Sequence, residues 1–243
     1  MASAPVPPDD AFLRSLNARI DQATADAEPL ASPHDGAPVE LRDDVIAAAG
    51  GIADELVALS RDVHAHPEEA FDEQYATAEV TKLLARHGHR AETGIGGLPT
   101  ALAAATGTGG PHLAVLAEYD ALPGIGHGCG HNIICATAVG AYLAAAPAVA
   151  ATGGRLSLVG TPAEEGGGGK EILARAGVFD DVDAVVMLHP FSHDIAIHPF
   201  LGRRQLEMVF HGVAAHAAAQ PFMGRNALDA AVAAYQGIAA LRQ

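Results

Sequence analysis

Residues 113–126, LAVLAEYDALPGIG, form an apolar stretch that leads directly into His127-Gly128-Cys129-Gly130-His131. Two further apolar stretches end in a comparable way: RLSLVGTPA (155–163) in Glu164-Glu165, and AVVML (184–188) in His189. In an open α/β sheet, ligands bind beyond the carboxyl ends of the strands. The three stretches therefore predict thiol, imidazole and carboxylate groups at one sheet edge. Zinc and similar ions prefer such groups.

The segments around these stretches predict the rest of an α/β fold. Apolar positions from 45 to 63 alternate four and three apart, which is typical of an amphipathic helix. We also expect helices and further strands, in chain order, at 74–87 (helix), 98–105 (strand), 112–118 (strand), 133–151 (helix), 155–160 (strand), 170–176 (helix) and 184–188 (strand). This alternation predicts a mainly parallel sheet flanked by helices.

The composition divides the chain into three parts. Residues 1–40 are rich in Pro, Ala and Asp and predict an N-terminal extension or linker. Residues 41–201 carry the α/β pattern. In 203–211 apolar and polar residues alternate, which predicts a half-exposed strand, and a helix is expected at 226–241. We therefore expect residues 202–243 to begin a second, smaller domain.

Charge and cysteine content restrict the class of partner and the compartment. The formal net charge of −15 argues against nucleic acid, because phosphate binding needs clustered Lys and Arg. Two cysteines form no disulfide framework, and the first residues show no signal peptide, so we expect a cytoplasmic protein. The uncharged stretch 133–151 is rich in Ala and contains Pro147, which favours a buried helix over a membrane span.

The residues at the three strand ends have the chemistry of a metal site. His127, Cys129 and His131 alternate with glycines, which let the backbone bend so that these side chains face one point. Adjacent carboxylates at Glu164-Glu165 are unfavourable unless a cation neutralises them, and one can bind metal while the other acts as general base. A tight turn, a solvated acidic loop and a core histidine at His189 are the alternatives. Taken together, the strand ends favour metal.

Five stretches of the chain, in this order, resemble the M20 metallopeptidases. The resemblance is strongest to the amidohydrolase branch of aminoacylase-like proteins, aminobenzoyl-glutamate hydrolases and M20 domain-containing protein 2. It covers roughly residues 41–243. The stretches are HAHPEEAFDE (64–73), LAEYDALPGIGHGCGHN (116–132), GTPAEEGGGGK (160–170), MLHP (187–190) and GVAAHAAAQPFMGRNALDA (212–230).

The resemblance implies a catalytic α/β domain with two divalent ions, Zn²⁺ or Mn²⁺. It implies that the metal ligands are Cys129, His131, Glu165 and His189. Glu164 would be the general base, taking a proton from the attacking water and passing it to the leaving amine. The expected reaction is hydrolysis of an amide in an N-acyl amino acid, a dipeptide or an aminobenzoyl-glutamate.

The resemblance also implies roles for residues 202–243 as the beginning of an inserted α+β lid and dimerisation domain. His216 would stabilise the oxyanion from a neighbouring subunit, and Asn226 would contact substrate or cap a helix. A homodimer is expected for a full-length member. Family members are longer and carry a last histidine ligand near the C-terminus, so the chain is expected to be a truncated member.

Three other interpretations remain open at this stage. The first is a catalytically impaired metal-binding homologue. The second is a cysteine-nucleophile hydrolase that pairs Cys129 with His131 or His127. The third is a barrel-type metallohydrolase built on His64-Ala65-His66, although this pair is predicted at the end of a helix, where the helix dipole favours positive charge.

Overall fold

The computed structural model describes residues 10–25, 35–192, 194–195, 202 and 204–242. The chain divides into two compact units, Met1–Ser192 and His193–Gln243. Within residues 1–40, helix α1 (Ala11–Ala25) precedes a stretch outside the described residues. The α/β architecture expected from the sequence lies in the first unit.

A five-stranded sheet with the order β1-β2-β4-β3-β5 forms the centre of this unit. Its strands are β1 (Ala91–Thr93), β2 (Leu102–Thr106), β3 (His112–Ala117), β4 (Arg155–Gly160) and β5 (Ala184–Val186). Strands β4 and β5 both pair with β3 in parallel, whereas β2 pairs antiparallel with β4 and β1 antiparallel with β2. The carboxyl ends of β3, β4 and β5 therefore share one edge, as the sequence predicted.

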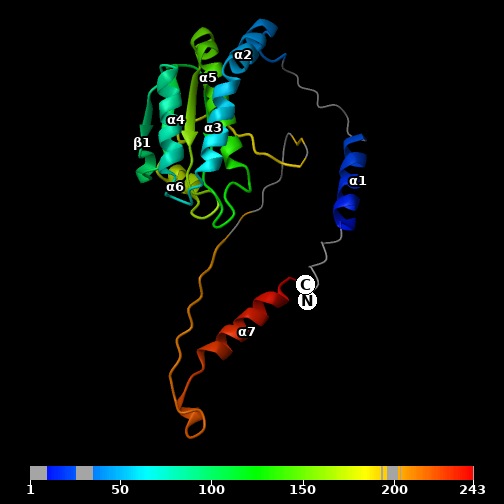
Figure 1. The fold of residues 1–243 in the computed structure, drawn as a ribbon, viewed down its shortest axis with the longest axis vertical. Helices are drawn as coiled ribbons and strands as arrows, with labels where there is room; N and C mark the ends of the chain where they lie inside the picture. Colours follow the sequence, from blue (N-terminus) through cyan, green and yellow to red (C-terminus); the bar gives the residue numbers. More distant parts are fainter. Residues whose placement is uncertain (1–9, 26–34, 193, 196–201, 203, 243) are drawn as a thin grey trace. The chain divides into compact units, whose positions relative to one another are not determined.

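Helices cover both faces of the sheet (Figure 1). One face carries helices α3 (Ala53–Ala65), α4 (Gln74–Arg86) and α5 (His131–Thr152), and the other carries α6 (Gly169–Arg175). Helix α2 (Val39–Gly51) packs on α5. The single amphipathic helix expected over 45–63 is in fact two helices, because the backbone departs from helical geometry at Ile52. A 3-10 turn, η1 (Ile95–Gly97), links β1 to β2.

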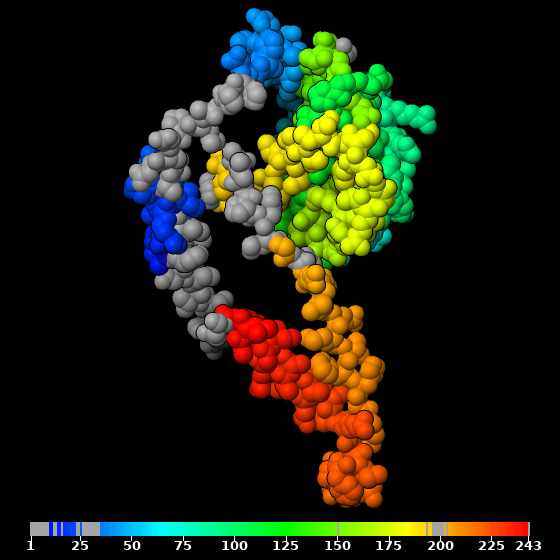
Figure 2. Space-filling model, turned by 180° about the vertical axis from the view of Figure 1, so that it is seen from behind, coloured from blue at the N-terminus to red at the C-terminus, as the bar shows by residue number. Residues whose placement is uncertain are grey.

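Two apolar clusters hold the layers together. The larger joins the sheet to α3, α4 and α5 and includes Val63, Tyr142 and Leu158. The smaller lies on the opposite face, where Leu173 of α6 packs on Leu116 and Val159. The yellow-green segment that follows β4 lies on the face seen in Figure 2.

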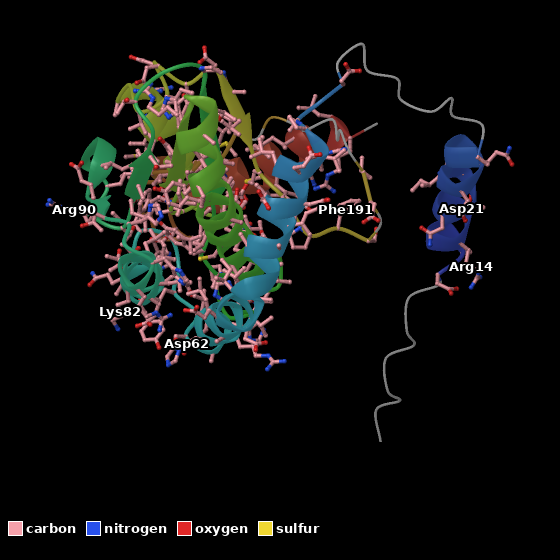
Figure 3. All side chains as sticks on the ribbon, turned by 90° about the horizontal axis from the view of Figure 1, so that it is seen from above. Arg14, Asp21, Asp62, Lys82, Arg90 and Phe191 are labelled. Carbon is pink, nitrogen blue, oxygen red and sulfur yellow. The ribbon has the colours of Figure 1, made fainter. Side chains whose placement is uncertain are left out.

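Helix α5 is the central helix of the larger layer. Its stretch His131–Val149 is long and apolar enough to cross a membrane by length and composition, but 61% of it is buried inside the protein. Its neighbours are α2, α3 and the central strands. Charged side chains such as those of Asp62, Lys82 and Arg90 lie at the outside of this body (Figure 3).

The second unit differs from the expectation at one point. Residues 204–211 form no strand, although their alternating pattern predicted one. A half-exposed strand needs a hydrogen-bonded partner, and the pairing found in the described part of this unit is a single bridge, Val213 to Arg225. A short turn, η2 (Pro221–Met223), and helix α7 (Ala227–Ala240) follow. The domain limits at 40 and 201 stay predictions.

The larger apolar cluster predicts that replacing two strand leucines lowers the stability of the fold by unequal amounts. Leu158 of β4 is 0% exposed, whereas Leu113 of β3 is 36% exposed. We expect Leu158→Ala to lower the free energy of unfolding by about 2–5 kcal/mol, because it leaves a cavity in the larger cluster. The matched control Leu113→Ala should cost less than half as much. Equal losses in denaturant titrations would contradict the assignment of this core.

Candidate metal centre

Polar residues follow each of the three parallel strands where the strand ends. Glu118 comes directly after β3 and Asp120 follows after two residues, and both are buried. Glu164-Glu165 follow β4 after three residues, and His189 follows β5 after two. Because the carboxyl ends of parallel strands meet at one edge, these side chains converge. The sequence predicted this convergence for all three stretches, but for the first it singled out the residues from His127 to His131 and not Glu118 or Asp120.

Helix α5 delivers the central residue, His131, at its first position. The preceding Gly130 has φ 81°, and a Cβ there would lie 3.0 Å from Cγ of Pro190, so this turn requires glycine. The His131 ring is 1% exposed, and its Nδ1–H donates to Oδ1 of Asp120 at 2.9 Å. This hydrogen bond fixes the proton on Nδ1 and leaves Nε2 as a metal-ligating lone pair.

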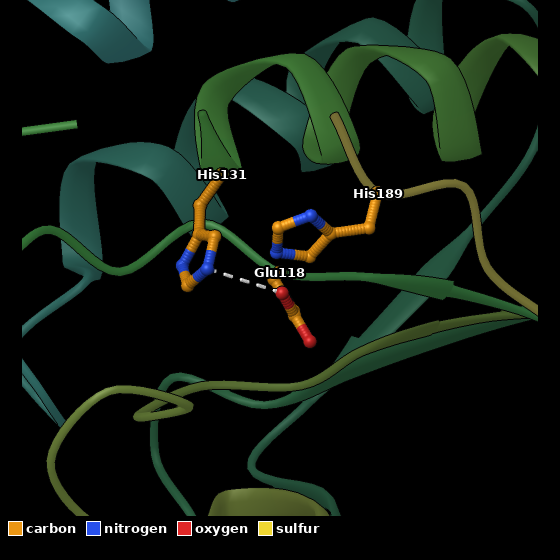
Figure 4. Close-up of side chains that lie close together, drawn as sticks. All are labelled: Glu118, His131 and His189. Atoms are coloured by element: carbon orange, nitrogen blue, oxygen red, sulfur yellow. Dashed lines mark ion pairs between the residues drawn. The ribbon is translucent and has the colours of Figure 1, made fainter. Parts of the chain in front are cut away.

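One donor group consists of Glu118, His131 and His189 (Figure 4). One ligand atom from each lies within 4.8 Å of the others. His131 Nε2 is 3.2 Å from Oε2 of Glu118, and the two imidazole rings meet edge to face at 6.1 Å. Glu118 comes from the end of β3, His131 from the start of α5 and His189 from the loop after β5.

A second donor group shares His131 and adds Glu164 and Glu165. His131 Nε2 is 3.8 Å from Oε2 of Glu164 and 3.8 Å from Oε1 of Glu165. The backbone N–H of Glu165 donates to Oδ2 of Asp120 at 2.8 Å. Asp120 therefore orients both His131, through a hydrogen bond to its ring, and Glu165, through a hydrogen bond to its backbone.

The donor atoms present fit a divalent cation. Oε2 of Glu118 and Nε2 of His131 are buried, and neither has a hydrogen-bond partner within the described residues. A buried polar atom without a partner is unfavourable, and a cation between these two would satisfy both. Imidazole nitrogen with carboxylate oxygen is a donor set that Zn²⁺ and Mn²⁺ accept.

Lys170 brings a positive charge to this edge. Its ammonium pairs with Oε1 of Glu118, from the first turn of α6. Desolvation and the Glu118 charge raise the pKa of Glu164, while the nearby Lys170 ammonium opposes the shift. The sequence pattern showed only the start of a helix at this position. In the structure, Lys170 helps to neutralise a crowded set of carboxylates.

Cys129 lies beside the second donor group but belongs to neither group. Its thiol hydrogen-bonds the Glu165 carboxylate, and this bond, with burial and the nearby acidic charges, raises the thiol pKa to about 11. A nucleophilic cysteine needs a thiolate and an adjacent base. The hydrogen bond to a carboxylate rather than to His131 or His127 disfavours the cysteine-nucleophile interpretation.

The barrel interpretation is wrong, because the sheet is open and mixed. His64 and His66 lie at the carboxyl end of α3, as expected. His66 Nδ1 donates to the Asp62 carbonyl, and its ring stacks on Tyr75. His127 lies with its ring 6.1 Å from that of His64 and is in neither donor group of the described residues.

The two remaining predicted residues lie in the second unit. Nδ1 of His216 accepts the backbone N–H groups of Ala218 and Ala219 at 3.2 and 3.1 Å. Oδ1 of Asn226 accepts the N–H of Leu228 at 3.1 Å, so Asn226 is the N-cap of α7. This favours the capping role that the sequence had left open for Asn226.

Sequence reasoning did not single out Glu118, Asp120 or Lys170. The signal for the first two was available, since both acidic residues follow the apolar run of 113–117. The rule applied to the other two strands assigns them to the same edge. Lys170 carries no such signal, because its partner is 52 positions away in the sequence and the local pattern shows only a helix start.

Comparison with known proteins is consistent with this geometry. Residues 114–240 match the model of peptidase family M20/M25/M40. The chain belongs to this family. The matched region contains every residue of the two donor groups.

Two curated relatives of this M20 chain are hydrolases. It is 42% identical over 205 residues to the Xaa-Arg dipeptidase of Mus musculus, covering 79% of this chain and 48% of that protein. It is 37% identical over 185 residues to a p-aminobenzoyl-glutamate hydrolase subunit of Escherichia coli (strain K12), covering 68% of this chain and 38% of that protein. The chain therefore spans about half or less of the length of these relatives.

A solved structure of the M20 family has a similar fold. The YXEP protein of Bacillus subtilis, described as a dinuclear metal-binding peptidase of the M20 family, matches with a TM-score of 0.52 and 28% identity. The match covers 56% of this chain and 42% of that protein. The M20 resemblance inferred from the sequence motifs is thus confirmed, as is the α/β fold class.

The double role of Asp120 predicts a large effect on metal affinity. We expect Asp120→Ala to weaken Zn²⁺ binding by about 10–100-fold, because the His131 ring and the Glu165 backbone both lose an orienting partner. Calorimetric titration of the metal-free chain measures this effect. The exposed Asp181, which pairs with Arg155, is the control, and Asp181→Ala should leave affinity within about twofold. Equal effects in the two variants would refute the role of Asp120.

Proposed function

We propose that this M20 chain is part of a metal-dependent hydrolase that cleaves amide bonds in small substrates. The observation that carries the proposal is the position of His131, whose Nε2 belongs to both donor groups. His131 Nε2 would hold one ion, and the carboxylates of Glu118, Glu164 and Glu165 around it offer oxygen donors for a second, in line with the dinuclear site named for the YXEP protein. The expected substrates are dipeptides, N-acyl amino acids or aminobenzoyl-glutamate, in line with the names of the two hydrolase relatives.

Cys129, His131, Glu165 and His189 would hold the ions, with Glu118 as a further ligand from β3. The mixed thiol, imidazole and carboxylate set is compatible with Zn²⁺ or Mn²⁺. Bound there, such ions supply the Lewis acidity that polarises an amide carbonyl and activates water. The measured metal content should therefore fall in Cys129→Ala and His189→Ala variants.

Glu164 is the residue best suited to move the proton. Its carboxylate belongs to the second donor group, yet its side chain is 41% exposed, so water can reach it. Desolvation raises its pKa above the ordinary value of a glutamate, which brings it closer to that of an effective general base at neutral pH. Its carboxylate would accept the proton of the attacking water and release it to the leaving amine nitrogen.

His216 would stabilise the developing oxyanion. Because its Nδ1 accepts backbone N–H groups, the ring proton lies on Nε2, which is then a hydrogen-bond donor. The contribution of one such donor is on the order of 3 kcal/mol. In this proposal the complete protein is a cytoplasmic homodimer in which His216 serves the neighbouring subunit. No nucleic acid or membrane is involved.

The division of labour between the paired glutamates gives a direct test. We expect Glu164→Gln to lower kcat by about 10²–10⁴-fold with unchanged metal content, because it removes the base and leaves the ligands. Glu165→Gln should lower the metal content itself. Hydrolysis of a dipeptide and N-acyl amino acid panel, with metal analysis of each variant, measures both effects.

Two results would overturn the proposed function. One is amide hydrolysis that persists after complete removal of metal by a chelator. The other is a metal-loaded chain that leaves the whole panel uncleaved, which would favour the catalytically impaired homologue instead. Near-native turnover in Glu164→Gln would refute the choice of base without refuting the metal site.

A further inference from the structure

Two residues other than glycine have a left-handed backbone in the described part of the chain. They are Phe71, with φ 67°, and Ala163, with φ 58°. This conformation is unfavourable for residues with a Cβ and persists only where the surroundings enforce it. The two residues lie 92 positions apart, one before α4 and the other in the loop after β4. They nevertheless share one hydrogen-bond partner.

That partner is Glu73, whose side chain is fully buried. Its Oε1 accepts the backbone N–H of Ala163 at 2.7 Å and that of Phe71 at 3.0 Å. Its Oε2 accepts the hydroxyl of Thr100 at 2.7 Å. A buried carboxylate is unfavourable without such partners. Here both oxygens are used, and one of them joins the two left-handed turns.

The two turns also pack against each other. A Cβ on Gly167 would lie 2.2 Å from Cε2 of Phe71 and 3.0 Å from the Cβ of Ala163, so only glycine fits between them. The N–H groups of Gly167 and Gly168 donate to the Ala163 carbonyl at 3.0 and 2.8 Å. The loop therefore winds around Ala163, whose own N–H is held from the other side by Glu73.

The position of this turn links Glu73 to the donor groups. Ala163 directly precedes Glu164-Glu165, and the N–H of Glu165 is held by Asp120. Two buried carboxylates therefore fix the backbone on either side of Glu164. Among the described residues, none of the hydrogen bonds of the Glu73 side chain involves a donor-group side chain. The hydrogen-bonded connection from Glu73 to the site therefore runs through the backbone.

We propose that Glu73 is a positioning residue that holds the left-handed turn at Ala163 and thereby aims Glu164 and Glu165 at His131. The inference rests on the metal site of the proposed function. It goes beyond that function because it assigns a role to a residue outside the site. Loss of Glu73 should release Ala163 toward an ordinary backbone conformation and turn the paired carboxylates away from His131.

The experiment compares metal affinity with stability in one set of variants. We expect Glu73→Met to weaken Co²⁺ or Zn²⁺ binding by about tenfold. A factor of this size matches the cost of the left-handed conformation for a residue with a Cβ. Adding Ala163→Gly should restore most of that affinity, because glycine adopts the turn without help. Glu73→Met should also lower the melting temperature, because residue 73 is buried, and the melting temperature should stay low in the double variant.

Two further variants serve as controls. Glu73→Gln keeps an oxygen that can accept both backbone N–H groups, so it should retain metal affinity. Thr100→Val removes only the hydrogen bond to Oε2, so it should lower the melting temperature and leave metal affinity within about twofold. A merely structural role for Glu73 predicts the opposite pattern, in which affinity follows stability in every variant.

The proposal is overturned if Glu73→Met binds metal as the unchanged chain does, or if Ala163→Gly restores nothing. If Glu73→Met does not fold, the test is hydrogen exchange of the backbone amides in the unchanged, metal-free chain. The amides of Ala163 and Phe71 should then exchange slowly and at similar rates, and rapid exchange at Ala163 would refute the inference. Because neither readout uses substrate, a failure of the proposed hydrolysis is distinguishable from a failure of this role.

Discussion

The site depends on one buried carboxylate, that of Asp120. One of its oxygens accepts the Nδ1–H of His131, and the other accepts the backbone N–H of Glu165. It thereby ties the end of β3 to the start of α5 and to the loop after β4. Burial alone lowers the pKa of a histidine, but the hydrogen bond to Asp120 and the nearby carboxylates raise the pKa of His131 above its ordinary value. The other residues of the two donor groups lie around the pair formed by Asp120 and His131.

The sequence predicted the part of the structure that follows from strand direction. Apolar runs of five or six residues between helical patterns predict parallel strands, and the residues after them must meet at one edge. This rule brought together His131, Glu165 and His189. It also applies to Glu118, whose signal in the sequence is weaker than that of the glycine-spaced histidines that follow it. Side-chain pairs such as Lys170 with Glu118 depend on how α6 packs, which no local pattern shows.

Local patterns predicted some features of the chain well and missed others. Alternation in residues 204–211 predicted a strand, but a strand forms only when another segment supplies its hydrogen bonds. The helix near the end of the chain was predicted almost to the residue, because its period and its Asn226 cap are local features. The backbone strain at Ala163 had no signal in the sequence, since alanine is not expected to be left-handed.

The central claim is that His131 lies at a metal centre built from three strand ends. The most direct test is anomalous X-ray diffraction from crystals of the chain grown with Zn²⁺. The account predicts an anomalous peak about 2.0–2.1 Å from Nε2 of His131, within reach of Glu165 or of Glu118 and His189. A peak at His64 and His66 instead, or ordered protein with no peak near His131 at saturating zinc, would contradict it.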